Sequence, residues 1–218
     1  MRRPDAFYRL YERRLARGLD RERLPHHVGV LVDGNRRWAR AFGATTQEGH
    51  QAGADRIIDF IGWCDEVGVP VVTLYMLSTE NLARPAAELT PLLEIIISTA
   101  QRLAEPREDR APVRVQPVGA VELLPPRMAQ CLQEVAQRTK DNEGVHVNVA
   151  VGYGGRLEIV DAVRELLAEA DAAGRSAADV AAELTVDQIS DRLYTRGQPD
   201  PDLVIRTSGE QRLSGFLT

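Results

Sequence analysis

The sequence predicts an α/β fold: a single domain with a central parallel β-sheet flanked by helices. Short apolar runs alternate with longer segments whose apolar residues recur at helical spacing. Strands separated by helices pair in parallel and are covered on both faces. A length of 218 residues suits one domain, and a composition with 44% hydrophobic residues can supply a sizeable core.

The chain begins with an amphipathic helix, expected over residues 5–22, which forms an N-terminal helical arm (1–24) ahead of the main domain (25–218). Its apolar residues fall near helical spacing: Phe7, Leu10, Tyr11, Leu15 and Leu19. Its other faces are rich in arginine, so one interpretation is a helix on an anionic membrane surface. The other is an arm packed on its own domain or on a second subunit. Acidic residues at 12, 20 and 22 dilute the basic charge and favour the packed arm.

Five strands and the helices between them follow in order. The strands are expected over residues 26–32, 70–77, 113–118, 145–151 and 203–205. The helices are expected over residues 51–67, 89–103, 128–135, 159–170 and 185–193, the last with Thr185 as its N-cap. Residues 171–183 are rich in alanine and weakly patterned, which favours a solvent-exposed connection.

The charge and the cysteines narrow the class of protein. A formal net charge of −5 argues against non-specific binding to nucleic acid, but local positive charge can still bind anions. Cys64 and Cys131 form no C-x-x-C pair and are expected to be buried free thiols in a reducing cytoplasm. No apolar run approaches the roughly 18 residues of a membrane span, and none follows the N-terminal arginines as in a signal peptide. A cytoplasmic protein is expected.

Polar, glycine-rich segments follow four of the five predicted strands. They cover residues 33–38, 78–85, 152–156 and 206–214, whereas the third strand is followed only by Gly119 and Ala120. Ligands of open parallel sheets bind beyond the carboxyl ends of the strands. The four segments should therefore meet at one edge of the sheet.

This edge has the chemistry of a diphosphate site. Glycines at 34, 154, 155 and 209 let backbone N–H groups approach an anion, and the helix after Gly34 directs its positive end there. Forked hydrogen bonds to phosphate can come from Arg37, Arg206 and Arg212, and a hydroxyl from Ser214. The nucleotide motifs G-x-G-x-x-G and G-x-x-x-x-G-K-[ST] are absent from the sequence.

One carboxylate, Asp33, stands among these cationic groups. Phosphates repel a carboxylate unless a cation lies between them, and Mg²⁺ binds carboxylate and phosphate oxygens together. Asp33 is therefore the expected metal ligand.

Five stretches resemble the cis-prenyltransferase family, also called undecaprenyl diphosphate synthase-like enzymes. They are residues 27–38 (HVGVLVDGNRRW), 49–53 (GHQAG), 74–85 (LYMLSTENLARP), 153–156 (YGGR) and 203–214 (LVIRTSGEQRLS). They run in family order across nearly the whole chain. The resemblance implies a single α/β domain, usually a homodimer, that joins isopentenyl diphosphate to an allylic diphosphate with Mg²⁺. The D-D-x-x-D motif of the unrelated trans-prenyltransferases is absent.

The resemblance also implies roles for individual residues. Asp33 would hold Mg²⁺ and help the allylic diphosphate to leave, and that diphosphate would be cradled by Gly34, Asn35, Arg36 and Arg37. Isopentenyl diphosphate would be held by Arg84, Arg206, Arg212 and Ser214. The proton-removal side would be lined by Asn81, with Ser78 and His50 nearby.

Two of these residues have other interpretations. His50 opens a predicted helix and could be its cap, although the G-H-x-A-G context favours a functional role. Trp38 is expected beside the substrate as a packing anchor rather than a catalyst.

Departures from the family pattern point to a short product. Met76 replaces a small residue, usually alanine, and Leu82 replaces a tryptophan common in the family. Thr46 stands near a position where many members have an arginine. Binding of the allylic diphosphate is therefore expected to rely more on Arg36 or Arg40. The helix after Arg84 carries isoleucine at 95, 96 and 97, so it either lines the tunnel for the growing chain or is a buried core helix. With Met76 in its wall, such a tunnel would be shorter.

The expected product is a fifteen-carbon (2Z,6E)-farnesyl diphosphate made from geranyl diphosphate. The alternatives are a long-chain decaprenyl or undecaprenyl diphosphate synthase, a non-catalytic partner subunit and a phosphate-binding regulatory domain. Non-catalytic partner subunits tend to lose the aspartate after the first strand and the phosphate-binding arginines. This sequence keeps the corresponding residues, together with the asparagine: Asp33, Arg37, Asn81, Arg206 and Arg212. Family members continue beyond the position of Thr218, and an acidic residue that completes the metal site is expected there.

Overall fold

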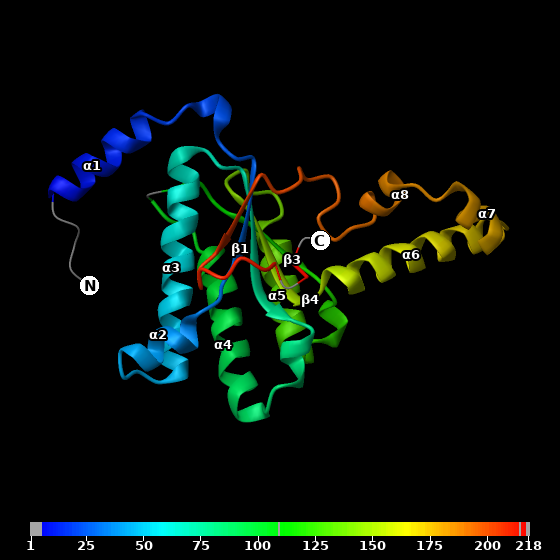
Figure 1. Cartoon of the computed structure of the whole chain (residues 1–218), viewed down its shortest axis with the longest axis horizontal. Coiled ribbons are helices and arrows are strands. Elements are labelled where there is room, and N and C mark those ends of the chain that lie inside the picture. The colour runs from blue at the N-terminus through cyan, green and yellow to red at the C-terminus, as the bar shows by residue number, and fades with distance from the viewer. Residues whose placement is uncertain (1–5, 109, 214, 217–218) are drawn as a thin grey trace.

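Five parallel strands form the centre of the computed structural model, which describes residues 6–108, 110–213 and 215–216 (Figure 1). The strands are β1 (His27–Leu31), β2 (Val71–Ser78), β3 (Arg114–Val118), β4 (His146–Tyr153) and β5 (Leu203–Arg206). Their order in the sheet is β3-β4-β2-β1-β5, and every neighbouring pair is parallel. The predicted fold class is confirmed, and each strand lies where its apolar run predicted it to within two residues.

Three helices pack on one face of the sheet. They are α3 (Thr46–Val67), α4 (Ala86–Leu103) and α5 (Pro126–Thr139). One residue from each, Ile61, Ile96 and Leu132, is fully buried in the same core as Leu74 and Val149 of the strands. Removing this apolar surface from water is the main stabilising contribution to the fold.

The opposite face of the sheet differs from the expectation that helices cover both faces. On this face a small apolar cluster, Leu31, Val118, Ala150, Tyr153 and Phe216, lies beside buried polar side chains. His27 Nε2 bonds Thr73 Oγ1 at 2.7 Å, and Asn148 donates to Thr73 at 2.9 Å. Asn148 also exchanges hydrogen bonds with Gln198, and His27 Nδ1 lies 2.7 Å from the Pro199 carbonyl. The connection before β5 therefore covers the polar part of this face through hydrogen bonds that satisfy its buried polar groups.

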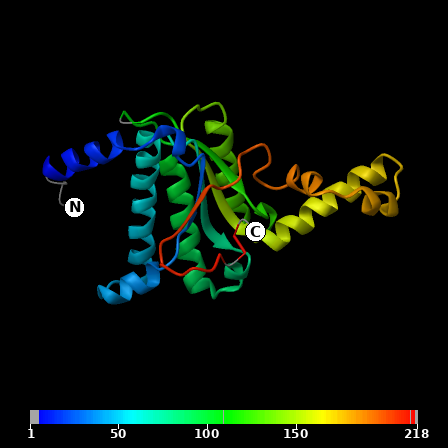
Figure 2. The same cartoon turned by 45° about the horizontal axis from the view of Figure 1, so that its top comes forward.

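Helix α6 (Gly155–Ala172) runs away from the sheet and contacts α7 (Ala177–Glu183) and α8 (Val186–Ser190), as Figures 1 and 2 show. Residues 171–183 are exposed as predicted, apart from Val180, but the prediction missed the helix α7 within them. The Ser176 hydroxyl accepts from the Asp179 N–H, and the Asp179 carboxylate accepts from the Ser176 N–H, so this capping box opens α7. Thr185 caps α8 as predicted, but α8 ends at Ser190.

Helix α1 (Ala6–Arg17) stands to one side of the sheet, at the opposite end of the molecule from α7 (Figures 1 and 2). It ends before Gly18, earlier than predicted, and a short 3-10 turn over Arg21–Arg23 follows. The described apolar side chains of this segment, Leu10, Tyr11, Leu15 and Leu19, are all exposed. They are therefore not packed on their own domain. None of the helices in the described part of the chain has the length and apolar character that a membrane-spanning helix requires.

The two cysteines lie on separate helices and form no disulfide. Cys64 in α3 is buried, as expected, and burial raises the pKa of its thiol to about 12, which keeps it protonated and unreactive. Cys131 in α5 is only half-buried.

Two glycines of the G-H-x-A-G stretch let helix α2 (Asn35–Ala41) lie directly on α3. A Cβ at Gly49 would stand 2.5 Å from the Asn35 carbonyl oxygen, and one at Gly53 would stand 2.6 Å from the Asn35 side-chain amide. Helix α3 begins earlier than predicted because Thr45 and Glu48 form a capping box at its start. The stretch thus positions the residues that follow β1.

Gly49→Ala should destabilise the protein, because its methyl group would meet backbone atoms of α2. We expect the free energy of unfolding to fall by roughly 1–3 kcal/mol, measured by urea denaturation. Gly62→Ala in the same helix is the matched control, since a Cβ there meets no atom within 4 Å. Its free energy of unfolding should rise by about 0.5–1 kcal/mol. Similar results for both variants would contradict the close approach of α2.

Candidate active site

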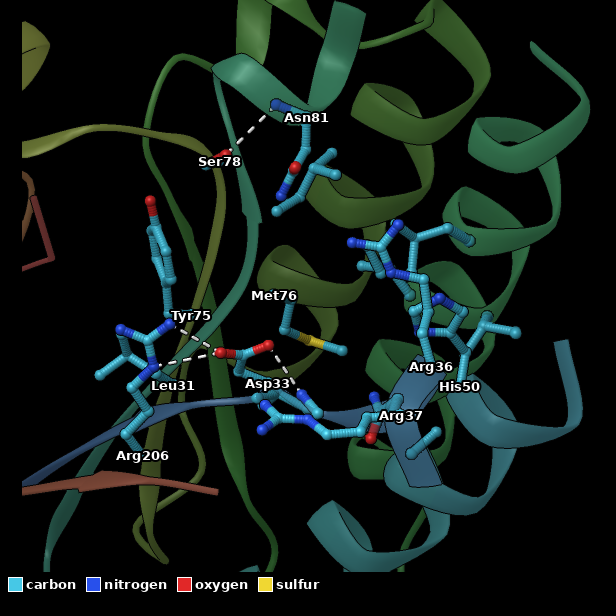
Figure 3. A pocket seen from close by; sticks show the side chains of 18 of the residues that line it. Leu31, Asp33, Arg36, Arg37, His50, Tyr75, Met76, Ser78, Asn81 and Arg206 are labelled. Carbon is cyan, nitrogen blue, oxygen red and sulfur yellow. Dashed lines mark hydrogen bonds and ion pairs between the residues drawn. The ribbon is translucent and has the colours of Figure 1, made fainter. Parts of the chain in front are cut away.

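A cavity of about 690 Å³ opens at the carboxyl ends of β1, β2 and β5 (Figure 3). Twelve residues with predicted site roles line it: Asp33, Gly34, Asn35, Arg36, Arg37, His50, Met76, Ser78, Asn81, Arg84, Arg206 and Arg212. They come from three of the four polar segments, except Met76, which belongs to β2, and His50, which belongs to α3. The sheet edge that the strand order predicted is therefore one continuous cavity.

The other predicted residues have different outcomes. Trp38 does not line the cavity; its side chain is half-exposed and its ring lies 5.0 Å from that of Phe42. Ser214 lies outside the described residues. Tyr153 is fully buried against Tyr75 and Phe216, so the YGGR stretch supports β2 from behind and lies outside the cavity lining.

Asp33 is held at the end of β1 by its neighbours. The Gly34 N–H donates to Oδ1 at 2.7 Å, and Arg206 donates to Oδ2 through Nη2 at 2.7 Å and Nε at 3.1 Å. Partial burial acts to raise the pKa of Asp33, but hydrogen bonds from Arg206, Ser208 and Gly34 outweigh it and hold the pKa below its ordinary value. Asp33 is therefore a carboxylate at neutral pH.

Glu210 is a site residue to which the sequence assigned no role. It lines the cavity and pairs with Arg206 at 3.1 Å, with Arg212 at 2.9 Å and with Arg37 at 3.8 Å. The sequence did contain a signal for this residue, since Glu210 is a carboxylate between Arg206 and Arg212 in the segment that follows β5. Glu210 and Asp33 together keep these three arginines gathered at one side of the cavity.

His50 lies on the opposite side of the cavity, beside Arg36 (Figure 3). It is inside α3, whose N-cap is Thr45, so it is not a helix cap. Its Nε2 is buried and has no hydrogen-bond partner among the described residues. Burial, then Arg84 and Arg36, lower the pKa of His50 below its ordinary value, and Glu88 partly offsets this. His50 is therefore neutral at pH 7 and can accept a proton.

The floor of the cavity is apolar. It is formed by residues of α3, α4 and β2: Ala54, Ile57, Met76, Leu92, Ile95 and Ile96. Of the three consecutive isoleucines, Ile97 is buried without lining the cavity, so α4 is both a wall of the cavity and a core helix. This floor suits an apolar chain attached to a diphosphate at the rim.

Met76 lines the cavity at an irregular point of β2. The pairing of β2 with β4 shifts register between Tyr75 and Leu77, which leaves Met76 unpaired in a β-bulge. Alternation along β2 places Met76 on the same face as Val72 and Leu74, and the bulge lets Leu77 join that core as well. Figure 3 shows Met76 projecting towards the space between Asp33 and His50.

Asp33 suits one ligand of Mg²⁺. Mg²⁺ is commonly bound through one or two carboxylates together with substrate phosphates and waters, not by an all-protein cage. Within residues 6–108, 110–213 and 215–216, no three His, Cys, Asp or Glu side chains gather as such a cage would require. One carboxylate at the rim, with Glu210 nearby, fits a metal that binds together with a diphosphate.

A cationic rim with one fixed carboxylate above an apolar floor defines an enzyme that binds diphosphates of apolar chains. Residues 31–218 match the model of the Prenyltransf family, described as "Putative undecaprenyl diphosphate synthase". The chain belongs to this family and is a prenyl-transferring enzyme.

The relatives narrow this class. The chain is 59% identical over 211 residues to a (2Z,6E)-farnesyl diphosphate synthase of Thermobifida fusca, covering 96% of this chain and 81% of the relative. It is 49% identical to another of that name from Mycobacterium tuberculosis, covering 98% and 81%. A crystal structure of lavandulyl diphosphate synthase from Lavandula x intermedia, in complex with dimethylallyl diphosphate, superimposes with a TM-score of 0.78 at 31% identity, covering 88% and 81%.

Arg206→Gln should raise the pKa of Asp33 towards its ordinary value, because it removes the strongest hydrogen bonds to the carboxylate. A lowered pKa in the folded state stabilises the protein above the unfolded pKa, and this contribution is lost as pH falls through the folded value. The variant should therefore lose less stability on acidification. Carboxyl ¹³C NMR between about pH 2 and pH 6 measures the pKa directly. An unchanged Asp33 pKa would show that this ion pair does not form in solution.

Proposed function

We propose that this chain adds one isopentenyl unit to geranyl diphosphate and releases (2Z,6E)-farnesyl diphosphate. The observation that carries the proposal is the single cavity in which Asp33 and the arginines of the rim stand above the apolar floor. Two of its relatives, at 59% and 49% identity, bear the name of this activity.

The rim offers two groups of cations for two diphosphates. The allylic diphosphate would lie against Gly34, Arg36 and Arg37, with its chain over the apolar floor. Isopentenyl diphosphate would lie between Arg84, on one side, and Arg206 on the other. Holding both reactants side by side converts a bimolecular encounter into a step within one complex, which lowers the barrier substantially.

The reaction breaks the allylic C–O bond, whose electron pair leaves with the diphosphate. Guanidinium groups of the rim stabilise the charge that develops on the leaving oxygen. Mg²⁺, held by Asp33, would supply further stabilisation of the diphosphate charge. The isopentenyl double bond then forms the new C–C bond to the allylic carbon, and loss of a proton yields the new cis double bond.

The base on the proton-accepting side would be His50, which is neutral and whose buried Nε2 has no partner among the described residues. Ser78 and Asn81 line the cavity beyond β2, where the Asn81 N–H donates to the Ser78 hydroxyl at 3.2 Å. We assign these three residues to the removal or orientation of the proton.

An assay with labelled isopentenyl diphosphate, geranyl diphosphate and Mg²⁺ tests the proposal. Asp33→Ala should lower turnover at least about a hundredfold, because the carboxylate that Gly34 and Arg206 fix at the end of β1 is lost. Asp55→Ala is the control, since Asp55 is an exposed carboxylate of α3 that pairs with Arg102 outside the cavity. Thermal unfolding of both variants should stay near that of the wild type. Full turnover by Asp33→Ala would reject the assigned role.

Met76→Ala should lengthen the product, because it removes a side chain from the cavity wall. Product chromatography should then show chains of twenty carbons or more, which is about one isoprene unit or more beyond the wild-type product. Met76→Leu keeps a similar volume and should keep the wild-type product. An unchanged product from Met76→Ala would show that this residue does not stop elongation. A wild-type product of decaprenyl or undecaprenyl length would instead favour the long-chain alternative.

We further propose a homodimer in the cytoplasm, with α1 covered by a second subunit or resting on an anionic membrane. The support is the exposed Leu10, Tyr11, Leu15 and Leu19, beside arginines at 14 and 17. Analytical ultracentrifugation, with and without anionic vesicles, separates these two coverings. A monomer that ignores vesicles would contradict both.

A further inference from the structure

Glu88 joins two arginines that come from different elements of the rim. Its Oε1 accepts from Arg36 Nη1 at 3.2 Å and from Arg84 Nη1 at 3.0 Å. Arg36 belongs to α2, Arg84 ends the 3-10 helix over Glu80–Ala83, and Glu88 lies in the first turn of α4. Both arginines line the cavity, whereas Glu88 does not.

The two guanidinium groups would repel one another without this carboxylate. Because both bind the same oxygen, their Nη1 atoms stand no more than about 6.2 Å apart. His50 lies beside them, and both arginines act on its ionisation. One shared acceptor therefore holds two cations in fixed positions at the side of the cavity that faces Arg206.

We propose that Glu88 is a positioning residue that fixes the separation of the two diphosphate-binding groups by tying Arg36 to Arg84. The inference rests on the proposed function, in which Arg36 contacts the allylic diphosphate and Arg84 contacts isopentenyl diphosphate. Glu88 acts through the arginines and touches neither substrate. Its loss should loosen both binding groups together, although each arginine contacts a different substrate.

The ion pairs of Glu88 are partly exposed, so their contribution to stability can be separated from their effect on binding. Exposed ion pairs contribute little to stability, and the side chains of Glu88 and Arg36 are 32% and 49% exposed. If Glu88 only stabilised the fold, its removal would leave substrate binding unchanged. If Glu88 positions the two arginines, its removal changes substrate binding and leaves the stability of the fold unchanged. The two roles give different measurements.

Glu88→Gln and Glu88→Ala separate hydrogen-bond geometry from charge. Gln retains an oxygen acceptor for the two arginines but lacks the negative charge, and Ala lacks both. We expect the KM of each substrate to rise roughly threefold to tenfold in Glu88→Gln and further in Glu88→Ala, with kcat within about threefold of the wild type. The melting temperature should be unchanged.

Glu94→Gln is the matched control. Glu94 lies on the same helix and also pairs with an arginine, Arg127, at 2.5 Å, but neither residue lines the cavity. Its substitution should leave both KM values unchanged.

Two further measurements need no turnover. Isothermal titration with inorganic pyrophosphate should give a weaker affinity for Glu88→Gln than for the wild type and Glu94→Gln. NMR of the His50 ring should show its pKa falling further in Glu88→Gln, because Glu88 is the group that raises it. A wild type that binds pyrophosphate but extends no chain would reject the proposed function, and the titration would still test Glu88.

The proposal is overturned by any of three results. Unchanged KM values and pyrophosphate affinity would show that the arginines keep their positions without Glu88. A rise in the KM of only one substrate would show that Glu88 serves one arginine. Tighter binding in both variants would show that its negative charge opposes the diphosphates more than its hydrogen bonds help.

Discussion

The contact between Asp33 and Arg206 is the interaction on which the site depends. The two residues are 173 positions apart in the chain, yet they follow neighbouring parallel strands, since Leu31 of β1 is in register with Arg206 of β5. Parallel pairing brings the carboxyl ends of both strands to the same edge. The forked bond from Arg206 keeps Asp33 ionised and fixed, so the carboxylate that would bind a metal and the guanidinium that would bind phosphate are positioned by one contact.

Carboxylates control the positions of the cations on both sides of the cavity. Asp33 and Glu210 gather Arg206, Arg212 and Arg37 on one side. Glu88 gathers Arg36 and Arg84 on the other. A cluster of unpaired arginines would repel one another and lose their positions when no ligand is bound. Paired arginines keep geometry between binding events, which reduces the entropy that diphosphate binding must offset.

The polar rim and the apolar floor of the cavity are built from different parts of the fold. Rim residues come from the segments that follow β1, β2 and β5, while the floor comes from α3, α4 and the bulge at Met76. The core helices that stabilise the domain thus also form the wall along which an apolar chain can lie. A change of floor residue should therefore affect both packing and the space for that chain, whereas a change at the rim should affect mainly the binding of the diphosphate.

The sequence by itself determined the strands, the fold class and most of the site, because apolar periodicity and the residues that follow each strand are local properties. The capping boxes at Thr45 and Ser176 were also local and readable, and they would have corrected the start of α3 and revealed α7. Only the tertiary structure decided which residues share the cavity: it excluded Trp38 and the YGGR stretch, added Glu210, and brought Arg36 and Arg84 to one carboxylate. These relations depend on strand order, a bulge and helix packing, which join residues far apart in the chain and leave no periodic signal in it.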